Sequence, residues 1–153
     1  MRIIGGRHRG AKLADLAGSK TRPTADRVRE SIFNILAGGR YGSPLISGIV
    51  LDMFAGTGAI GLEALSRGAA KAHFVENDSA ALAVLRENVN KLQRMDVCKV
   101  IAGDATRLVN WRGDPANLVF ADAHYGTGEG LRAVANLHAI SALCSDSVVV
   151  IET

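Results

Sequence analysis

Residues 48–152 alternate strictly between short apolar segments and segments with helical periodicity. The apolar, strand-like segments lie at residues 48–54, 71–76, 97–102, 117–122 and 148–152. Helices are expected at residues 58–67, 78–94 and 129–139, with a short helical stretch after Asp104. Because apolar strands that alternate with helices need cover on both faces, the pattern predicts an α/β fold with a mostly parallel sheet and helices on both sides.

The first 43 residues follow a different pattern. Two short strands at residues 2–5 and 11–16 are expected to form a hairpin around a basic turn, and a helix is expected at residues 25–37. That helix should bury one apolar face and turn Arg27 and Arg29 toward solvent or a ligand; the face consists of Val28, Ile32, Ile35 and Leu36. Turn-forming residues at 38–44 divide this extension, residues 1–43, from a second region, residues 44–153.

Positive charge is concentrated in the N-terminal extension, although the net charge of the whole chain is only +3. Residues 1–40 contain nine Lys or Arg and three Asp or Glu, whereas residues 41–153 contain nine Lys or Arg and twelve Asp or Glu. The basic segment is either a docking surface for a polyanion or a solvated face without a partner, and charge alone leaves both interpretations open.

Other classes of protein are disfavoured by the sequence. No apolar run is long enough for a membrane span and the chain starts without an apolar leader, so we expect a cytoplasmic protein with no membrane partner. Cys98 and Cys144 lie far apart and match no metal-binding spacing, so we expect reduced thiols rather than a disulfide or a metal site.

A glycine-rich pattern follows the first predicted strand of the sheet. Gly56, Gly58 and Gly61 form G-x-G-x-x-G between that strand and the next helix, the context in which this pattern binds nucleotides. Glu76 ends the second strand and could accept both ribose hydroxyls of an adenosine, while Asp104, at the end of the third, could accept an adenine amino hydrogen. Each feature alone also fits a plain turn or a helix cap. Together they predict a cofactor crevice at the carboxyl ends of three strands.

Asp52 helps to separate two classes of nucleotide cofactor. A dinucleotide places its pyrophosphate at the glycine loop, where a neighbouring carboxylate would repel it, whereas the ammonium group of S-adenosylmethionine could bind Asp52 directly or through water. We therefore favour S-adenosylmethionine. The residues expected to contact it are Asp52, Phe54, Ala55, Gly56, Gly58, Glu76, Asn77, Asp104, Ala105 and Asp122.

Four blocks of sequence, at residues 1–6, 21–36, 50–58 and 61–69, carry a resemblance that covers essentially the whole chain. Through them the chain resembles the bacterial guanine-N2 methyltransferases of 16S ribosomal RNA, a class I S-adenosylmethionine-dependent family. The resemblance implies a Rossmann-like methyltransferase fold with a small basic N-terminal extension that docks on RNA. It also implies 16S ribosomal RNA, naked or in a partly assembled small subunit, as the partner of a monomeric enzyme that needs no metal.

The chain departs from this family at the end of the fourth strand, where the usual Asp-Pro-Pro-Tyr is replaced by Asp122-Ala123-His124-Tyr125. The resemblance implies that the Asp122 carboxylate and the Ala123 carbonyl accept hydrogen bonds from the target amine, and that Tyr125 stacks on the base. His124 is either a catalytic base or a substituted loop residue with no role. Loss of two prolines leaves the loop less rigid and the site less preorganised.

The same resemblance assigns RNA binding to the extension, with steep salt dependence because the contacts would be to phosphates. The residues expected to make these contacts are Arg2, Arg7, Arg9, Lys12, Lys20, Arg22, Thr24 and Arg27. Other functions stay open at this point: methylation of another base or of a protein amide, a dinucleotide-dependent oxidoreductase, and a non-catalytic RNA-binding module that keeps the cofactor pocket.

Overall fold

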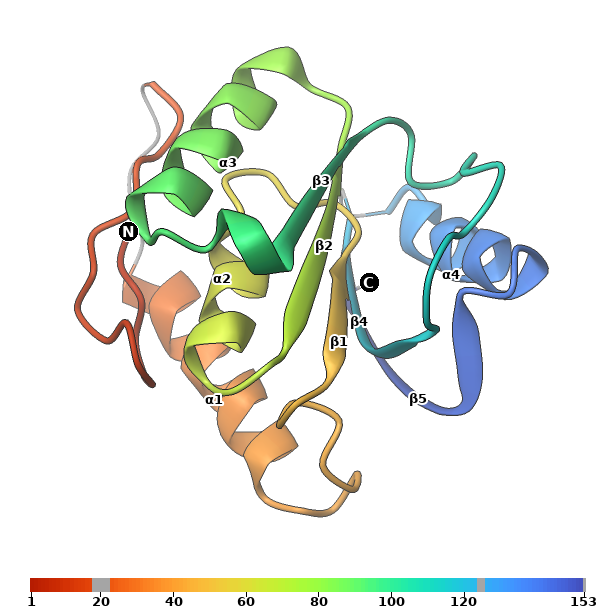
Figure 1. Cartoon of the computed structure of the whole chain (residues 1–153), viewed down its shortest axis with the longest axis horizontal. Helices are drawn as coiled ribbons and strands as arrows, with labels where there is room; N and C mark the ends of the chain where they lie inside the picture. The colour runs from red at the N-terminus through yellow and green to blue at the C-terminus, as the bar shows by residue number, and fades with distance from the viewer. Residues whose placement is uncertain (18–22, 124–125, 153) are drawn as a thin grey trace.

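A computed structural model describes residues 1–17, 23–123 and 126–152. Its centre is one sheet of five strands in the order β3-β2-β1-β4-β5, and every neighbouring pair runs parallel (Figure 1). The strands are β1 (Ile49–Asp52), β2 (Lys71–Glu76), β3 (Cys98–Ala102), β4 (Ala116–Asp122) and β5 (Leu143–Glu152). The predicted parallel α/β architecture is confirmed, and β2 has the predicted bounds.

Helices cover both faces of this sheet, as predicted (Figure 1). They are α1 (Pro23–Ala37), α2 (Ala59–Ser66), α3 (Ser79–Lys91) and α4 (Glu129–Ala139), and a short 3-10 helix, η1, lies at Met95–Val97. One buried cluster joins α1, α2 and α3 to the sheet through Phe33, Leu62, Leu85 and Phe74. A second cluster joins α4 to the opposite face through Leu137 and other residues. All four residues predicted for the buried face of α3 are indeed buried: Leu82, Leu85, Val89 and Leu92.

The predicted helical stretch after Asp104 is wrong. Residues 105 and 106 form a turn, and residues 107–112 have no regular structure. The Asp104 carboxylate accepts hydrogen bonds from the backbone N–H and the hydroxyl of Thr106, at 2.8 and 2.7 Å. Bonds of this kind compete with helix formation, because they satisfy the backbone in a turn instead.

The N-terminal hairpin is present but shorter than predicted. In place of strands at residues 2–5 and 11–16, one antiparallel bridge joins Arg2 and Lys12. Three backbone hydrogen bonds extend the pairing, from Ile3 N–H to Ala11, from Gly10 N–H to Ile3 and from Leu13 N–H to Met1. The side chains of Ile3 and Leu13 are buried in the same cluster as the sheet, so the hairpin packs on the main core.

The buried face of α1 differs from the prediction by a rotation of the helix. Val28 and Ile35 are 48% and 56% exposed, while Arg29 and Phe33 are buried. The phenyl ring of Phe33 lies 5.5 Å from that of Phe120 in β4. Arg29 is turned inward because its guanidinium donates to the Arg2 carbonyl at 2.6 Å and lies 3.5 Å from a carboxylate oxygen of buried Glu63.

Within the part of the chain that the structure describes, every helix is too short or too polar to cross a bilayer. Cys98 and Cys144 are both free thiols, as predicted, and each is half-buried. Burial raises the pKa of the Cys98 thiol to about 12, so this thiol is protonated and unreactive at neutral pH.

Candidate cofactor site

A cavity of about 640 Å³ opens where β1, β2, β3 and β4 end. Its position follows from the topology, because the carboxyl ends of parallel strands meet at one edge and ligands bind in the crevice outside it. The volume is within the range of small-molecule sites, about 300–1,000 Å³. The lining includes Leu16, Phe54, Gly56, Glu76, Asn77, Asp78, Gly103, Asp104, Ala105, Asp122, Ala123 and Glu129.

Each of the three glycines in the predicted loop is required for a different structural reason. Gly56 borders the cavity in a left-handed conformation with φ of 55°, and a Cβ there would meet nothing within 4 Å. Gly58 does not line the cavity, and a Cβ on it would lie 2.4 Å from Leu85. A Cβ on Gly61 would lie 2.3 Å from the Phe74 ring. The predicted close approach of helix and strand at Gly61 is therefore confirmed, and Gly58 serves packing as well.

The Glu76 carboxylate holds the glycine loop against the end of β2. Its Oε1 accepts the Gly56 N–H at 2.8 Å, and its Oε2 accepts the N–H groups of Asn77 and Asp78 at 2.9 and 2.8 Å. A carboxylate has about four acceptor positions, so three of them are used and one on Oε1 stays available. Glu76 is thus fixed in orientation by backbone donors before any ligand arrives.

Asp52 lies behind the cavity rather than on its surface. The side chain is 2% exposed, and its Oδ2 accepts the N–H of Gly61 at 3.0 Å. Burial raises the pKa of Asp52 to about 7, with smaller contributions from the negative charges of Asp122 and Glu76 and an opposing one from the Gly61 hydrogen bond. Ala55 is also buried, and its N–H donates to Val75 at 3.0 Å. Neither Asp52 nor Ala55 is part of the cavity lining.

The third strand contributes an exposed carboxylate. The two hydrogen bonds from Thr106 are the main reason that the pKa of Asp104 is lowered. Asp104 lines the cavity together with Ala105 and Gly103. It therefore presents an ionised acceptor of fixed orientation at the end of β3.

The end of β4 carries the altered loop. Asp122 and Ala123 both line the cavity, beside Glu129 in the first turn of α4. The other two residues of the predicted catalytic set, His124 and Tyr125, lie outside the described residues. The structure therefore brings Asp122 into the same cavity as Gly56, Glu76 and Asp104.

The described residues that line the cavity are strongly acidic. Five are acidic, Glu76, Asp78, Asp104, Asp122 and Glu129, and none is Lys or Arg. Within residues 1–17, 23–123 and 126–152, no group of His, Cys, Asp and Glu is arranged to hold a metal ion. An acidic lining repels a pyrophosphate and attracts a ligand that carries positive charge.

The residues predicted to bind RNA lie mostly on the surface of the N-terminal segment. Arg2, Arg7, Arg9, Lys12 and Arg27 are exposed. Lys20 and Arg22 lie outside the described residues, as does the side chain of Thr24. The exposed side chains are therefore accessible to a partner, and their role in RNA binding stays a prediction.

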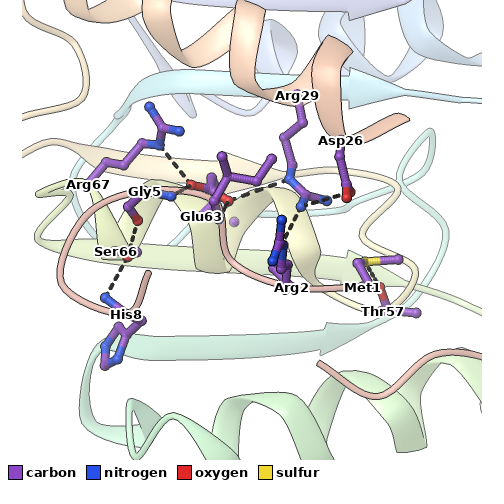
Figure 2. A network of polar contacts seen from close by, with 12 residues as sticks. Met1, Arg2, Gly5, His8, Asp26, Arg29, Thr57, Glu63, Ser66 and Arg67 are labelled. Carbon is purple, nitrogen blue, oxygen red and sulfur yellow. Dashed lines mark hydrogen bonds and ion pairs between the residues drawn. The ribbon is translucent and has the colours of Figure 1, made fainter. Parts of the chain in front are cut away.

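Two buried side chains of α2 that were not predicted from the sequence hold this segment in place (Figure 2). Glu63, fully buried, accepts the N–H groups of Ile4 and Gly5 at 2.9 and 3.0 Å and pairs with Arg67 at 2.7 Å. Ser66 accepts the His8 N–H at 2.8 Å and donates to the Gly5 carbonyl at 2.6 Å. The sequence did offer a signal for them, because Glu63 and Ser66 are polar residues inside the strongly apolar segment 59–66.

The family model described as conserved hypothetical protein 95 matches residues 1–153, the whole chain. The chain belongs to this family. Over 128 residues it is 41% identical to ribosomal RNA small subunit methyltransferase D of Escherichia coli K12, a match that covers 84% of this chain and 62% of that protein. It is also 40% identical over 110 residues to YlbH of Bacillus subtilis, a candidate rRNA methyltransferase, covering 72% of this chain and 57% of that protein.

Solved structures agree with this assignment. A candidate methyltransferase of Escherichia coli, yhhF, has a TM-score of 0.84 and 37% identity, covering 99% of this chain and 79% of that one. A candidate methylase of Haemophilus influenzae has a TM-score of 0.77 and 29% identity, covering 98% and 79%. The predicted Rossmann-like methyltransferase fold is confirmed. The chain spans about three fifths of the length of the curated relatives it matches.

Proposed function

We propose that this chain is an S-adenosylmethionine-dependent methyltransferase that modifies the exocyclic N2 amine of a guanine in small-subunit ribosomal RNA. The observation that carries the proposal is the acidic cavity at the carboxyl edge, where Gly56, Glu76, Asp104 and Asp122 meet. The similarity to ribosomal RNA small subunit methyltransferase D of Escherichia coli supports the coarser part of the proposal, methylation of small-subunit ribosomal RNA.

The residues of the cavity fit this cofactor. Glu76 keeps an acceptor position for a ribose hydroxyl, and Asp104 can accept the amino hydrogen of an adenine. Five carboxyl groups and no basic side chain among the described lining residues suit a ligand with a sulfonium and an ammonium group. A dinucleotide, with its two phosphates, fits the same lining poorly.

Asp52 fits a role behind this ligand rather than in direct contact with it. Through its hydrogen bond to the Gly61 N–H it holds the start of α2 in place, and Glu76 holds Gly56. The negative charge of a partly ionised Asp52 would still attract an ammonium group through the loop, since burial weakens screening.

When bound, the cofactor supplies a methyl group on a positively charged sulfur, open to in-line displacement. The chain's own residues prepare the attacking amine. Its lone pair is delocalised into the guanine ring, and acceptors at Asp122 and the Ala123 carbonyl would draw its N–H bonds into a pyramidal geometry that frees the lone pair. The same acceptors stabilise the positive charge that develops on nitrogen, and the methylated amine then gives up one proton to the Asp122 carboxylate or to solvent. A paired base has to leave its duplex to reach them.

A direct experiment is transfer of labelled methyl from S-adenosylmethionine to unmodified 16S RNA, both naked and in a partly assembled small subunit. Label on a guanine N2 supports the proposal. Label on another base or on protein would move the function to a different substrate. Cofactor binding without any transfer in single-turnover assays would show a binding protein, a result that the missing prolines at residues 123 and 124 make worth testing.

Asp122→Ala should abolish turnover while cofactor affinity stays within a few-fold of the unmodified chain, because Asp122 acts on the amine. Turnover is measured by methyl transfer and affinity by isothermal titration calorimetry. Asp96→Ala, which removes an exposed carboxyl away from the cavity, is the matched control and should retain both. A large loss of cofactor affinity in Asp122→Ala would contradict this division of roles.

A further inference from the structure

Asn88, in the last turn of α3, is a fully buried amide that joins two parts of the chain far apart in sequence. Its Oδ1 accepts the Ala14 N–H at 2.7 Å, and its Nδ2 donates to the Ala14 carbonyl at 3.0 Å. The same Nδ2 donates to the Thr57 carbonyl at 2.9 Å. Both donor hydrogens of the amide are therefore used, one toward the end of the N-terminal hairpin and one toward the glycine loop.

Thr57 lies between the two glycines that shape the cofactor loop. Gly56 and Gly58 both have positive φ, 55° and 86°, and glycine is the residue that changes such angles most easily. The Thr57 carbonyl is fixed by Asn88, and the Gly56 N–H on the preceding residue is fixed by Glu76. Two side chains from other elements, Glu76 of β2 and Asn88 of α3, thus help to hold the backbone of this part of the loop.

The hairpin reaches the same loop at a second point. The Thr57 hydroxyl donates to the Met1 sulfur at 3.7 Å (Figure 2), and the Met1 carbonyl accepts the Leu13 N–H at 2.8 Å. Leu16, two residues after Ala14, lines the cofactor cavity itself. Both ends of the segment that carries the exposed basic side chains therefore contact the loop or the cavity that would hold the cofactor.

We propose that Asn88 is a positioning residue that couples occupation of the basic N-terminal surface by RNA to binding of the cofactor. The inference rests on the proposed function. Any shift of the hairpin on RNA moves Ala14 and is passed through the buried Asn88 amide to the Thr57 carbonyl. In this proposal both ligands favour the same arrangement of the loop, and each then raises the affinity for the other by the same factor.

The test measures the dissociation constant of S-adenosylhomocysteine by calorimetry, with and without unmodified 16S RNA transcribed in vitro. The non-reactive ligand avoids turnover. In the unmodified chain, RNA should tighten binding by about 5-fold or more, the lower end of typical allosteric coupling. Asn88→Asp keeps the side-chain volume and the acceptor for Ala14, but loses the donors to the carbonyls of Ala14 and Thr57. This variant should bring the RNA-dependent factor close to one.

Asn90→Ala, at an exposed position two residues further along the same helix, is the control and should keep the full factor. If Asn88 serves stability alone, Asn88→Asp would weaken S-adenosylhomocysteine binding equally with and without RNA. An unchanged ratio of these two affinities in Asn88→Asp therefore overturns the inference. If the Asn88 variants do not fold, the unmodified chain decides: equal affinity with and without RNA also overturns it. Failure of the unmodified chain to bind S-adenosylhomocysteine at all would instead refute the proposed function beneath it.

Discussion

Asp52→Asn is expected to make the protein more stable, by an amount that grows with pH. In the native state the pKa of Asp52 is raised from 3.8 to about 7 by burial, so the folded chain binds this proton more tightly than the unfolded chain. The contribution of the protonated Asp52 to the free energy of unfolding is fully present below pH 3.8 and is lost as the pH rises toward 7. Asn carries no charge and still offers an oxygen to the Gly61 N–H.

The expected size of the effect follows from the two pKa values. At about 1.4 kcal/mol for each pH unit between 3.8 and about 7, an ionised Asp52 costs about 4 kcal/mol above neutral pH. Roughly 2 kcal/mol of this is already present at pH 5. The difference in unfolding free energy between Asp52→Asn and the unmodified chain should therefore increase by about 2–3 kcal/mol from pH 5 to pH 8.

Urea unfolding of both chains at pH 5, 6, 7 and 8 measures this difference directly. Asp96→Asn removes an exposed carboxyl and controls for the change in net charge. A stability difference that is the same at all four pH values would refute the reasoning. It would mean that Asp52 stays ionised in the native state, with the Gly61 hydrogen bond compensating for its burial.

Two further predictions concern packing beneath the site. Glu63→Ala should lower the unfolding free energy by about 3–5 kcal/mol in urea titrations, because it leaves buried partners without their carboxylate. The control, Glu87→Ala at an exposed position, should change the unfolding free energy by less than about 0.5 kcal/mol. Similar losses in both variants would contradict a special role for Glu63. Gly61→Ala should cost about 1–3 kcal/mol by pressing on the Phe74 ring, with Gly103→Ala, where a Cβ meets nothing within 4 Å, as its control. A melting temperature unchanged in Gly61→Ala would show that the ring can move aside.

Segments whose structure depends on nearby residues were predictable from the sequence. The bounds of β2 and α4 agree with the prediction, and so does the buried face of α3, because each has a clear period and clear end signals. The cofactor crevice was predictable for a related reason. Once the strands are known to be parallel, residues at their carboxyl ends have to meet, which places Gly56, Glu76, Asp104 and Asp122 around one cavity.

Features that depend on distant partners were not predictable in this way. The periodicity of α1 suggested that Val28 and Ile35 are buried, but the orientation of that helix is decided by Arg29, whose partners are Glu63 and the Arg2 carbonyl. Asn88 was missed although it lies between the apolar residues Leu85 and Val89. A polar residue within an apolar helical face indicates a buried side chain that needs a hydrogen-bond partner, but periodicity does not identify that partner.

The bonds that hold the N-terminal segment also determine when it can fold. Ile4 and Gly5 bind Glu63, 59 and 58 residues later, and Ala14 binds Asn88, 74 residues later. During synthesis this segment emerges before α2 and α3, so its buried partners do not yet exist when it leaves the ribosome. Contacts of such long sequence separation form slowly, because the intervening chain has to be ordered first. The most basic part of the chain therefore lacks its full set of anchors during translation until Asn88 has been added.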